Sequence, residues 1–251
     1  MAGCAVITGG AGGIGAATAE RLSARGLAVL IVDRDAEAAE AVAARLRAAG
    51  GIASAFAADV SREEDVAGYV ACALERYGRI DAFFNNAGIE GAIGNVEAYP
   101  VAEFDRVVAV NLRGTFLGLH HVVPVMRAQG GGAILNTASQ AGVRGVPGLS
   151  AYVATKHAVV GLSQGVALEV AAAGIRVNCL CPGPTETRMM DDIKAAVQAA
   201  GGDPASFVTR MPVGRFGEPG EIADVAAWAL TEAPGFMTGA VLTVDGAMTA
   251  P

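Results

Sequence analysis

The feature that most constrains this fold is a regular alternation of short β-branched runs with alanine-rich segments of helical period. Seven runs are typical of strands: 4–8, 27–32, 52–58, 80–86, 133–139, 175–181 and 240–245. Helical patterns lie at 13–25, about 36–49, about 102–128 and 150–173, and another begins at Ser61 with an expected N-cap. This alternation predicts parallel strands joined by right-handed crossover helices. We expect an α/β fold: one doubly wound domain over residues 1–251, with a parallel seven-stranded sheet and helices on both faces.

One stretch interrupts the alternation. Residues 184–217 lie between the sixth strand and the last helix and are rich in proline, glycine and methionine. An insertion there follows the carboxyl end of a strand, where open α/β sheets bind ligands. We expect a lid that covers the substrate, and a solvated connector is the alternative.

Charge and hydropathy exclude several classes of protein. A net charge of −7 and a pI near 5.0 leave no basic stripe for nucleic acid. No uncharged apolar run reaches the roughly 18 residues of a membrane span, and no signal peptide is visible. We therefore expect a cytoplasmic protein with no nucleic-acid or membrane partner.

Cysteines and histidines give no metal-ligand pattern. The four cysteines, at 4, 72, 179 and 181, lack paired C-x-x-C spacing, so we expect buried free thiols. Cys179 and Cys181 share one face of a strand. The three histidines, at 120, 121 and 157, are expected to form no cluster. The sequence thus predicts no metal.

The stretch T-G-G-A-G-G-I-G, residues 8–15, follows the first strand directly and opens the first helix. Glycines there let the backbone turn tightly and approach a pyrophosphate, which rests on the helix N-terminus. The stretch lacks the G-K-[ST] ending of the P-loop that nucleoside triphosphatases use to bind phosphate. It therefore predicts a dinucleotide site of the Rossmann type rather than a kinase or ATPase, and a glycine-rich surface turn is the alternative.

Asp33 ends the second strand, about eighteen residues after Gly15. A carboxylate at this place bonds the adenosine ribose hydroxyls and repels a 2′-phosphate. Arg34 adjoins it and could soften that repulsion. The cofactor is expected to be NAD (NADH), with NADP less favoured.

Tyr152 and Lys156 form a second conspicuous pattern, because the chain has only two lysines and four tyrosines. Residues i and i+4 of a helix are neighbours, so the ammonium can sit beside the phenol. A nearby positive charge lowers the pKa of a tyrosine, which is otherwise a poor base at neutral pH. An ordinary surface pair on a helix is the alternative.

Several motifs in a fixed order now resemble the short-chain dehydrogenase/reductase family, over nearly all of the chain. They are T-G-x-x-x-G-x-G from Thr8, Asp59-Val60, N-N-A-G at 85–88, Asn111, Ser139, Tyr152-x-x-x-Lys156, Pro182-Gly183 and Thr187. One departure is D-G-A at 245–247, where the family commonly has Asp-Gly-Gly.

The resemblance implies an NAD-dependent alcohol dehydrogenase or ketone reductase that forms a homotetramer. Tyr152 would be the general acid/base, Lys156 would serve it and the nicotinamide ribose, Ser139 would hold the substrate oxygen, and Asn111 would position a water. Cofactor contacts are implied for Gly9, Gly13, Ile14, Gly15, Asp33, Arg34, Asp59, Val60, Asn86, Ala87, Gly88, Tyr152, Lys156, Pro182, Gly183, Thr185 and Thr187.

The stretches 85–91, 104–119 and 136–148 look most like family members that act on cyclic ketones and alcohols. We expect a small cyclic or aliphatic secondary alcohol or ketone as substrate. Candidate pocket residues are Glu90, Ser139, Gln140, Val146 and Met189, with Arg144, Pro184 and Met190 as further candidates. Two alternatives stay open: reduction of a 3-oxoacyl thioester of acyl carrier protein, and a non-catalytic NAD(H)-binding protein on the same fold.

Overall fold

Seven parallel strands form one sheet in the computed structural model, which describes residues 3–199, 201–209 and 211–250. The strand order is β3-β2-β1-β4-β5-β6-β7, and each neighbouring pair is parallel. The bounds are β1 Cys4–Thr8, β2 Ala28–Asp33, β3 Ala53–Ala57, β4 Ala82–Asn85, β5 Gly132–Thr137, β6 Ile175–Pro182 and β7 Val241–Val244. The predicted doubly wound sheet is confirmed. The strand order reverses between β1 and β4, and open sheets of this kind bind ligands at such a point.

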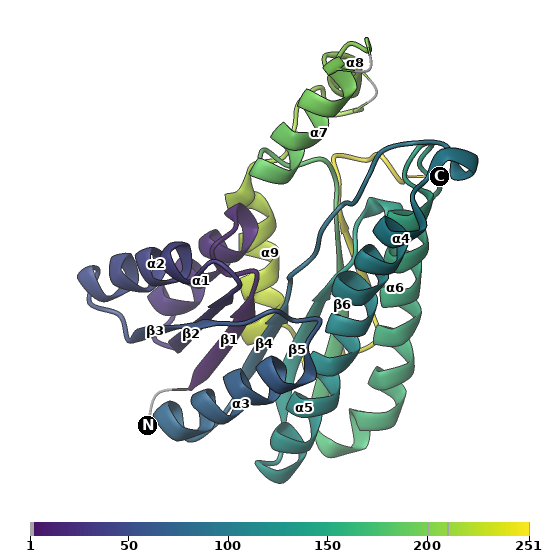
Figure 1. The fold of residues 1–251 in the computed structure, drawn as a ribbon. Coiled ribbons are helices and arrows are strands. Elements are labelled where there is room, and N and C mark those ends of the chain that lie inside the picture. The colour runs from purple at the N-terminus through teal and green to yellow at the C-terminus, as the bar shows by residue number, and fades with distance from the viewer. Residues whose placement is uncertain (1–2, 200, 210, 251) are drawn as a thin grey trace.

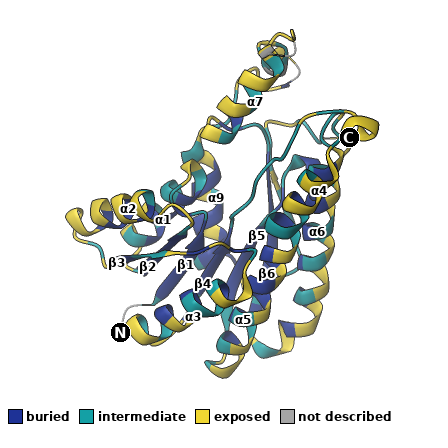
Figure 2. Ribbon diagram, viewed as in Figure 1, coloured by how far each residue is buried: buried dark blue, intermediate teal, exposed yellow. Residues whose placement is uncertain are grey.

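Helices cover both faces of this sheet (Figure 1). On one face lie α1 (Gly13–Ala24), α2 (Ala36–Ala48) and α9 (Pro219–Thr231); on the other lie α3 (Glu63–Tyr77), α5 (Gly114–Ala128) and α6 (Ser150–Val170). Each face has its own apolar layer, one around Leu22, Ile31 and Ile222 and the other around Leu30 and Val122. The five inner strands are therefore buried along almost their whole length, whereas the edge strands β3 and β7 are partly exposed and the outer helix faces are exposed (Figure 2).

The predicted single helix over 102–128 is instead three consecutive segments. α4 (Val101–Val107) leads into a π-helical segment, Val108–Arg113, which leads into α5. A π segment inserts an extra residue into a helical turn and often marks a functional site. Asn111 lies in this segment, and its backbone carbonyl accepts a hydrogen bond from the Thr115 hydroxyl at 2.7 Å.

The expected N-cap at Ser61 is wrong. α3 begins at Glu63, with Arg62 at the N-cap position, and no side chain caps the helix. The Ser61 hydroxyl and N–H both donate to Asp59 Oδ1, at 2.7 and 2.9 Å. Ser61 therefore stabilises the turn at Asp59 and does not cap the helix. The start of α3 is stabilised by the acids of its first turn, whose negative charges lie at the positive end of the helix dipole.

The segment 184–217 contains α7 (Arg188–Ala199) and α8 (Ser206–Thr209), which stand away from the sheet (Figure 1). Its two ends meet in a parallel bridge between Thr185 and Gly217. Gly217 N–H donates to the Pro184 carbonyl at 3.0 Å, and Glu186 N–H donates to the Gly217 carbonyl at 2.9 Å. Backbone hydrogen bonds thus hold the two ends of the segment together, and its function as a lid stays a prediction.

Short 3₁₀ helices occur at Val96–Ala98 (η1), Gln140–Gly142 (η3) and Ala171–Ala173 (η4). All four cysteines are buried and free, as predicted. Within the described ranges, no helix is both long enough and apolar enough to cross a bilayer.

Candidate active site

The glycine-rich loop joins β1 to α1 and leaves the start of the helix open. A Cβ at Gly15 would lie 2.2 Å from the Gly9 carbonyl oxygen, and Gly9 itself has a φ of +61°. α1 begins at Gly13 with no side-chain cap and no acid in its first turn. Its first N–H groups and the positive end of its dipole can therefore receive a pyrophosphate. The residues present fit the phosphates of a dinucleotide.

Asp33 holds a negative charge beside this loop. Its Oδ2 accepts a hydrogen bond from Ala11 N–H at 3.1 Å, and its Oδ1 accepts one from Asp35 N–H at 3.2 Å. The carboxylate is thus fixed at the end of β2, where a ribose lies in Rossmann folds. The neighbouring Arg34 is exposed, and its charge adds to the Ser61 hydrogen bonds that lower the pKa of Asp59. Val60 is buried against Gly114.

The segment Asn86–Gly88 is tied to the glycine loop by Thr8. The Thr8 hydroxyl accepts hydrogen bonds from Asn86 N–H at 2.9 Å and Ala87 N–H at 3.1 Å. A Cβ at Gly88 would lie 3.2 Å from Lys156 Nζ and 3.3 Å from Asn111 Oδ1. The segment therefore joins the glycine loop to Lys156 and Asn111, two of the predicted catalytic residues. Sequence reasoning missed this function of Thr8, for which the only signal was its place at the head of the glycine motif.

Tyr152 and Lys156 lie together on α6, with Lys156 Nζ 5.5 Å from the Tyr152 ring centre. The ammonium donates to the Thr137 carbonyl at 2.8 Å, and Lys156 is 3% exposed. Burial raises the pKa of Tyr152 to about 12, opposed by the Ser139 hydroxyl. Burial also lowers the pKa of Lys156 to about 8. The lysine was expected to lower the tyrosine pKa, but desolvation dominates, and the phenol is protonated at neutral pH.

Ser139 ends the loop after β5 and caps η3. Its Oγ accepts a hydrogen bond from Ala141 N–H at 3.1 Å, and its hydroxyl interacts with the Tyr152 phenol and lowers the pKa of that tyrosine. Gln140 follows it, and the Gln140 Oε1 is buried with no hydrogen-bond partner among the described residues. Ser139 thus brings a hydroxyl to Tyr152, and the next residue along the chain has a buried acceptor without a partner.

Asn111 uses its whole side chain to hold the site together. Its Oδ1 accepts from Ile89 N–H at 2.8 Å, and its Nδ2 donates to the Ile89 carbonyl at 2.8 Å and to Thr155 Oγ1 at 3.2 Å. Thr155, a residue that sequence reasoning missed, donates in turn to the Tyr152 carbonyl at 2.8 Å. Asn111 therefore positions both the segment after Gly88 and the helix that carries Tyr152. That it also positions a water stays a prediction.

The segment after β6 reaches back to the glycine loop. Thr185 is buried, and its hydroxyl donates to the Gly183 carbonyl at 2.9 Å. A Cβ at Gly13 would lie 3.1 Å from Thr187 Cγ2. β6 ends at Pro182, and the residues after it approach the start of α1. The predicted contacts of residues 182–187 with the cofactor would therefore be made beside the first turn of α1.

The predicted substrate residues behave differently from one another. Glu90 is half-buried, and desolvation together with the charge of Asp192 on α7 raises its pKa to about 8. Asp192 was missed, because on the sequence it is an ordinary helix-surface acid. Val146 and Met189 are half-buried and Met190 is buried, and their contact with substrate stays a prediction.

Arg144 is exposed, and its contact with substrate stays a prediction. It donates to the Met248 carbonyl at 2.9 Å and lines an open cavity with Thr243 and Asp245 near the C-terminal segment. The guanidinium bonds a residue that lies 104 positions later in the chain, so the sequence alone does not reveal this contact.

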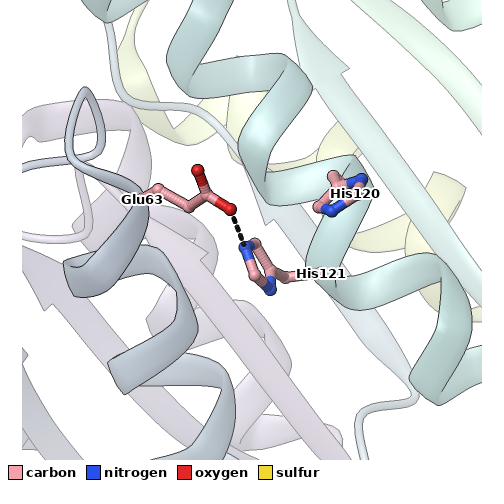
Figure 3. A group of neighbouring side chains, drawn as sticks. All are labelled: Glu63, His120 and His121. Atoms are coloured by element: carbon pink, nitrogen blue, oxygen red, sulfur yellow. Dashed lines mark ion pairs between the residues drawn. The ribbon is translucent and has the colours of Figure 1, made fainter.

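The expectation that the histidines form no cluster is wrong for two of them. His120 and His121 on α5 lie beside Glu63 on α3 (Figure 3). α3 and α5 pack side by side on one face of the sheet, so tertiary structure joins residues that are far apart in sequence.

Comparisons with known proteins agree with this geometry. Residues 9–249 match the family model described as enoyl-(acyl carrier protein) reductase. The chain is 43% identical to levodione reductase of Leifsonia aquatica, covering 98% of this chain and 93% of that one. It is 40% identical to cyclohexanol dehydrogenase of Acinetobacter sp. (strain SE19), covering 98% and 94%. It is also 42% identical to 2,5-dichloro-2,5-cyclohexadiene-1,4-diol dehydrogenase of Sphingobium indicum, covering 98% and 96%.

Solved structures show the same likeness. The crystal structure of levodione reductase superposes with a TM-score of 0.92 at 42% identity, covering 98% of this chain and 96% of that chain. NAD⁺-bound xylitol dehydrogenase gives 0.93 at 37% identity, covering 97% and 98%. Other similar structures hold NADH or NADP. The predicted resemblance to proteins acting on cyclic compounds is confirmed, and a nicotinamide dinucleotide is the shared cofactor class.

Proposed function

This chain belongs to the short-chain dehydrogenase/reductase family and is an oxidoreductase of alcohols, and we propose that Tyr152 exchanges the proton with a small ring-shaped alcohol or ketone. The observation that carries the proposal is the convergence of Lys156 Nζ, Asn111 Oδ1 and Gly88 next to Tyr152, one segment away from the glycine loop. Bound NAD(H) would supply or accept the hydride. The proposed proton and hydride transfers do not require a metal ion.

The protein groups suit ketone reduction at neutral pH. The phenol of Tyr152, with a pKa of about 12 before ligands bind, keeps the proton that a ketone oxygen must receive. Ser139 can turn its hydroxyl hydrogen from the Tyr152 phenol to the same substrate oxygen and so hold it. In the oxidation direction Tyr152 must first lose its proton, and the ammonium of Lys156 favours that form. Tyr152→Phe should therefore stop turnover and keep NADH binding.

We propose NAD(H) as the working cofactor because of Asp33. Its carboxylate is held by two backbone N–H groups and cannot easily turn away from a 2′-phosphate. Initial rates with one ketone, measured with NADH and with NADPH, test this assignment. Asp33→Ser should lower the ratio of the NADH rate to the NADPH rate, because it weakens the binding of NADH and permits the binding of NADPH. Equal rates with both cofactors in the wild type would contradict the assignment of NAD(H).

The substrate we propose carries a second oxygen beyond the one that reacts. Protonated Glu90 can donate a hydrogen bond, and the buried Oε1 of Gln140 can accept one. A buried polar group left without a partner costs free energy, so a substrate oxygen that pairs with it gains binding. These two polar groups favour a substrate with a second oxygen over a ring that carries only the reacting one. The diol named in one relative has this chemistry.

The test compares cyclohexane-1,4-dione with cyclohexanone under NADH. We expect the dione to have the higher kcat/KM, and Glu90→Leu or Gln140→Leu to reduce the ratio about tenfold. Exposed Glu97→Leu is the matched control and should keep the ratio. A wild-type ratio near one would reject the second oxygen. No turnover of either compound would reject the ring-ketone proposal itself.

The alternative of a 3-oxoacyl-thioester reductase predicts faster NADPH-dependent turnover of the thioester than NADH-dependent turnover of ring ketones. A lid at 184–217, a homotetramer built on α4–α6 and a cytoplasmic location remain predictions. Light scattering of the purified protein measures the assembly.

A further inference from the structure

Three side chains at the junction of α3 and α5 bring together the ligand types that zinc prefers. Glu63 is the first residue of α3, and His120 and His121 lie in the middle of α5. One ligand atom of each lies within 4.8 Å of the ligand atoms of the other two. In Figure 3 the Glu63 carboxylate points at the His121 ring, with His120 beside it. The cluster lies outside the active site.

His121 lacks the partner that a buried nitrogen needs. Its Nε2 is buried and makes no hydrogen bond among the described residues, although Glu63 Oε1 is only 3.8 Å away. That separation is too long for a hydrogen bond but close to the spacing of about 3.4 Å between two ligands of tetrahedral zinc with bonds near 2.0–2.1 Å. A cation between the two atoms would satisfy both.

The carboxylate of Glu63 is free for this purpose, unlike its neighbours. Arg62 pairs with Glu64 at 2.5 Å and with Asp65 at 3.9 Å. For Glu63, the ion pair found in the described part of the chain is the one with His121. Arginine thus engages the other two acids of this turn and leaves Glu63 facing the histidines.

His120 is held in place by an aromatic neighbour. Its ring stacks on Phe116, one turn earlier, with centroids 5.8 Å apart and planes 23° apart. The His120 and His121 rings meet edge to face at 5.0 Å. The stacking limits the rotation of the imidazole, so less rotational freedom is lost when a metal binds.

We propose that Glu63, His120 and His121 bind one zinc-class divalent cation that joins α3 to α5. Two imidazoles and one carboxylate suit Zn²⁺ and the neighbouring transition metals, whereas Mg²⁺ and Ca²⁺ require mainly oxygen ligands. Three protein ligands leave the fourth coordination position to water. The expected dissociation constant is on the order of 10 μM, weaker than in four-ligand structural sites.

The experiment is equilibrium dialysis of untagged, metal-stripped protein, in its own solution assembly, against Zn²⁺. We expect one zinc ion per chain, with affinity reduced at least about tenfold by Glu63→Gln or His121→Gln and more by His120→Gln combined with His121→Gln. The matched controls are His157→Gln, the third histidine, and Glu64→Gln, the adjacent acid; both should bind zinc as the wild type does. Circular dichroism and NADH turnover show whether each variant is folded.

Two further readouts keep the proposal open to refutation. Co²⁺ should give the visible absorption of a four-coordinate ion in the wild type but not in the double histidine variant. Zn²⁺ should raise the Tm of the wild type and of the two control variants, but not that of the double histidine variant. Absence of saturable zinc binding, full binding by the double variant, or equal binding of Mg²⁺ would overturn the assignment.

Discussion

Replacing Glu90 by glutamine removes an ionisation that the folded protein resists. Burial and the charge of Asp192 raise the pKa of Glu90 from 4.5 to about 8. The native state therefore binds more protons than the unfolded state between these pH values, so wild-type stability is complete below pH 4.5 and decreases as pH rises towards 8. pH 7 lies about 2.5 pH units above the unfolded-state pKa of Glu90, so the wild type has lost about 3 kcal/mol of its free energy of unfolding at that pH. Glu90→Gln keeps the shape of the side chain and has no such loss.

The assay is the Tm of both proteins at equal concentration from pH 5 to pH 8.5. We expect the wild type to lose about 5–10 °C relative to the variant between pH 5 and pH 7, because about 2.5 kcal/mol of the loss falls between these pH values and each kcal/mol shifts the Tm by about 2–4 °C. Asp192→Asn should remove part of the wild-type slope, and exposed Glu97→Gln should leave it unchanged. Parallel curves for the wild type and Glu90→Gln would refute the argument, because the carboxyl would then ionise as freely in the folded state as in the unfolded chain.

Four further outcomes follow from single contacts. Tyr152→Phe should lower turnover about 10²- to 10⁴-fold while fluorescence titration shows NADH still bound, and normal turnover would disprove its proton transfer. Gly15→Ala puts a Cβ 2.2 Å from a backbone oxygen and should abolish NADH binding in the same titration, whereas Gly161→Ala, in open space on α6, should keep it. Asn111→Ala leaves both polar groups of a backbone residue without their partner and should lower stability by about 2–4 kcal/mol in denaturant unfolding; an unchanged midpoint would count against that positioning function. Ala247→Gly should stabilise by about 1 kcal/mol, seen as a higher midpoint, because Ala247 has a φ of 69°.

The last of these shows how sequence and structure complement each other. The departure from Asp-Gly-Gly at 245–247 is visible in the sequence, but the backbone conformation of its third residue is not. The structure shows that the third position of D-G-A lies in the left-handed region, where alanine is strained and glycine is not. A pattern therefore identified the position, and only the backbone angles gave its cost.

The sequence by itself determined the parallel sheet, the glycine loop and the Tyr152–Lys156 pair. These features depend on local rules: the period of apolar residues, the glycines of a tight turn, and the i, i+4 spacing on a helix. Such rules act over a few residues and can be read without knowing what packs against them.

Tertiary structure alone decided the electrostatics and the long-range contacts. Burial, not the neighbouring ammonium, dominates the pKa of Tyr152, because desolvation depends on all the atoms around a group. The hydrogen bonds of Asn111 to Ile89 span 22 residues, and the approach of Glu63 to His121 needs two helices to pack together. A local sequence pattern predicts neither contact, because both depend on how the helices pack against the sheet and against one another.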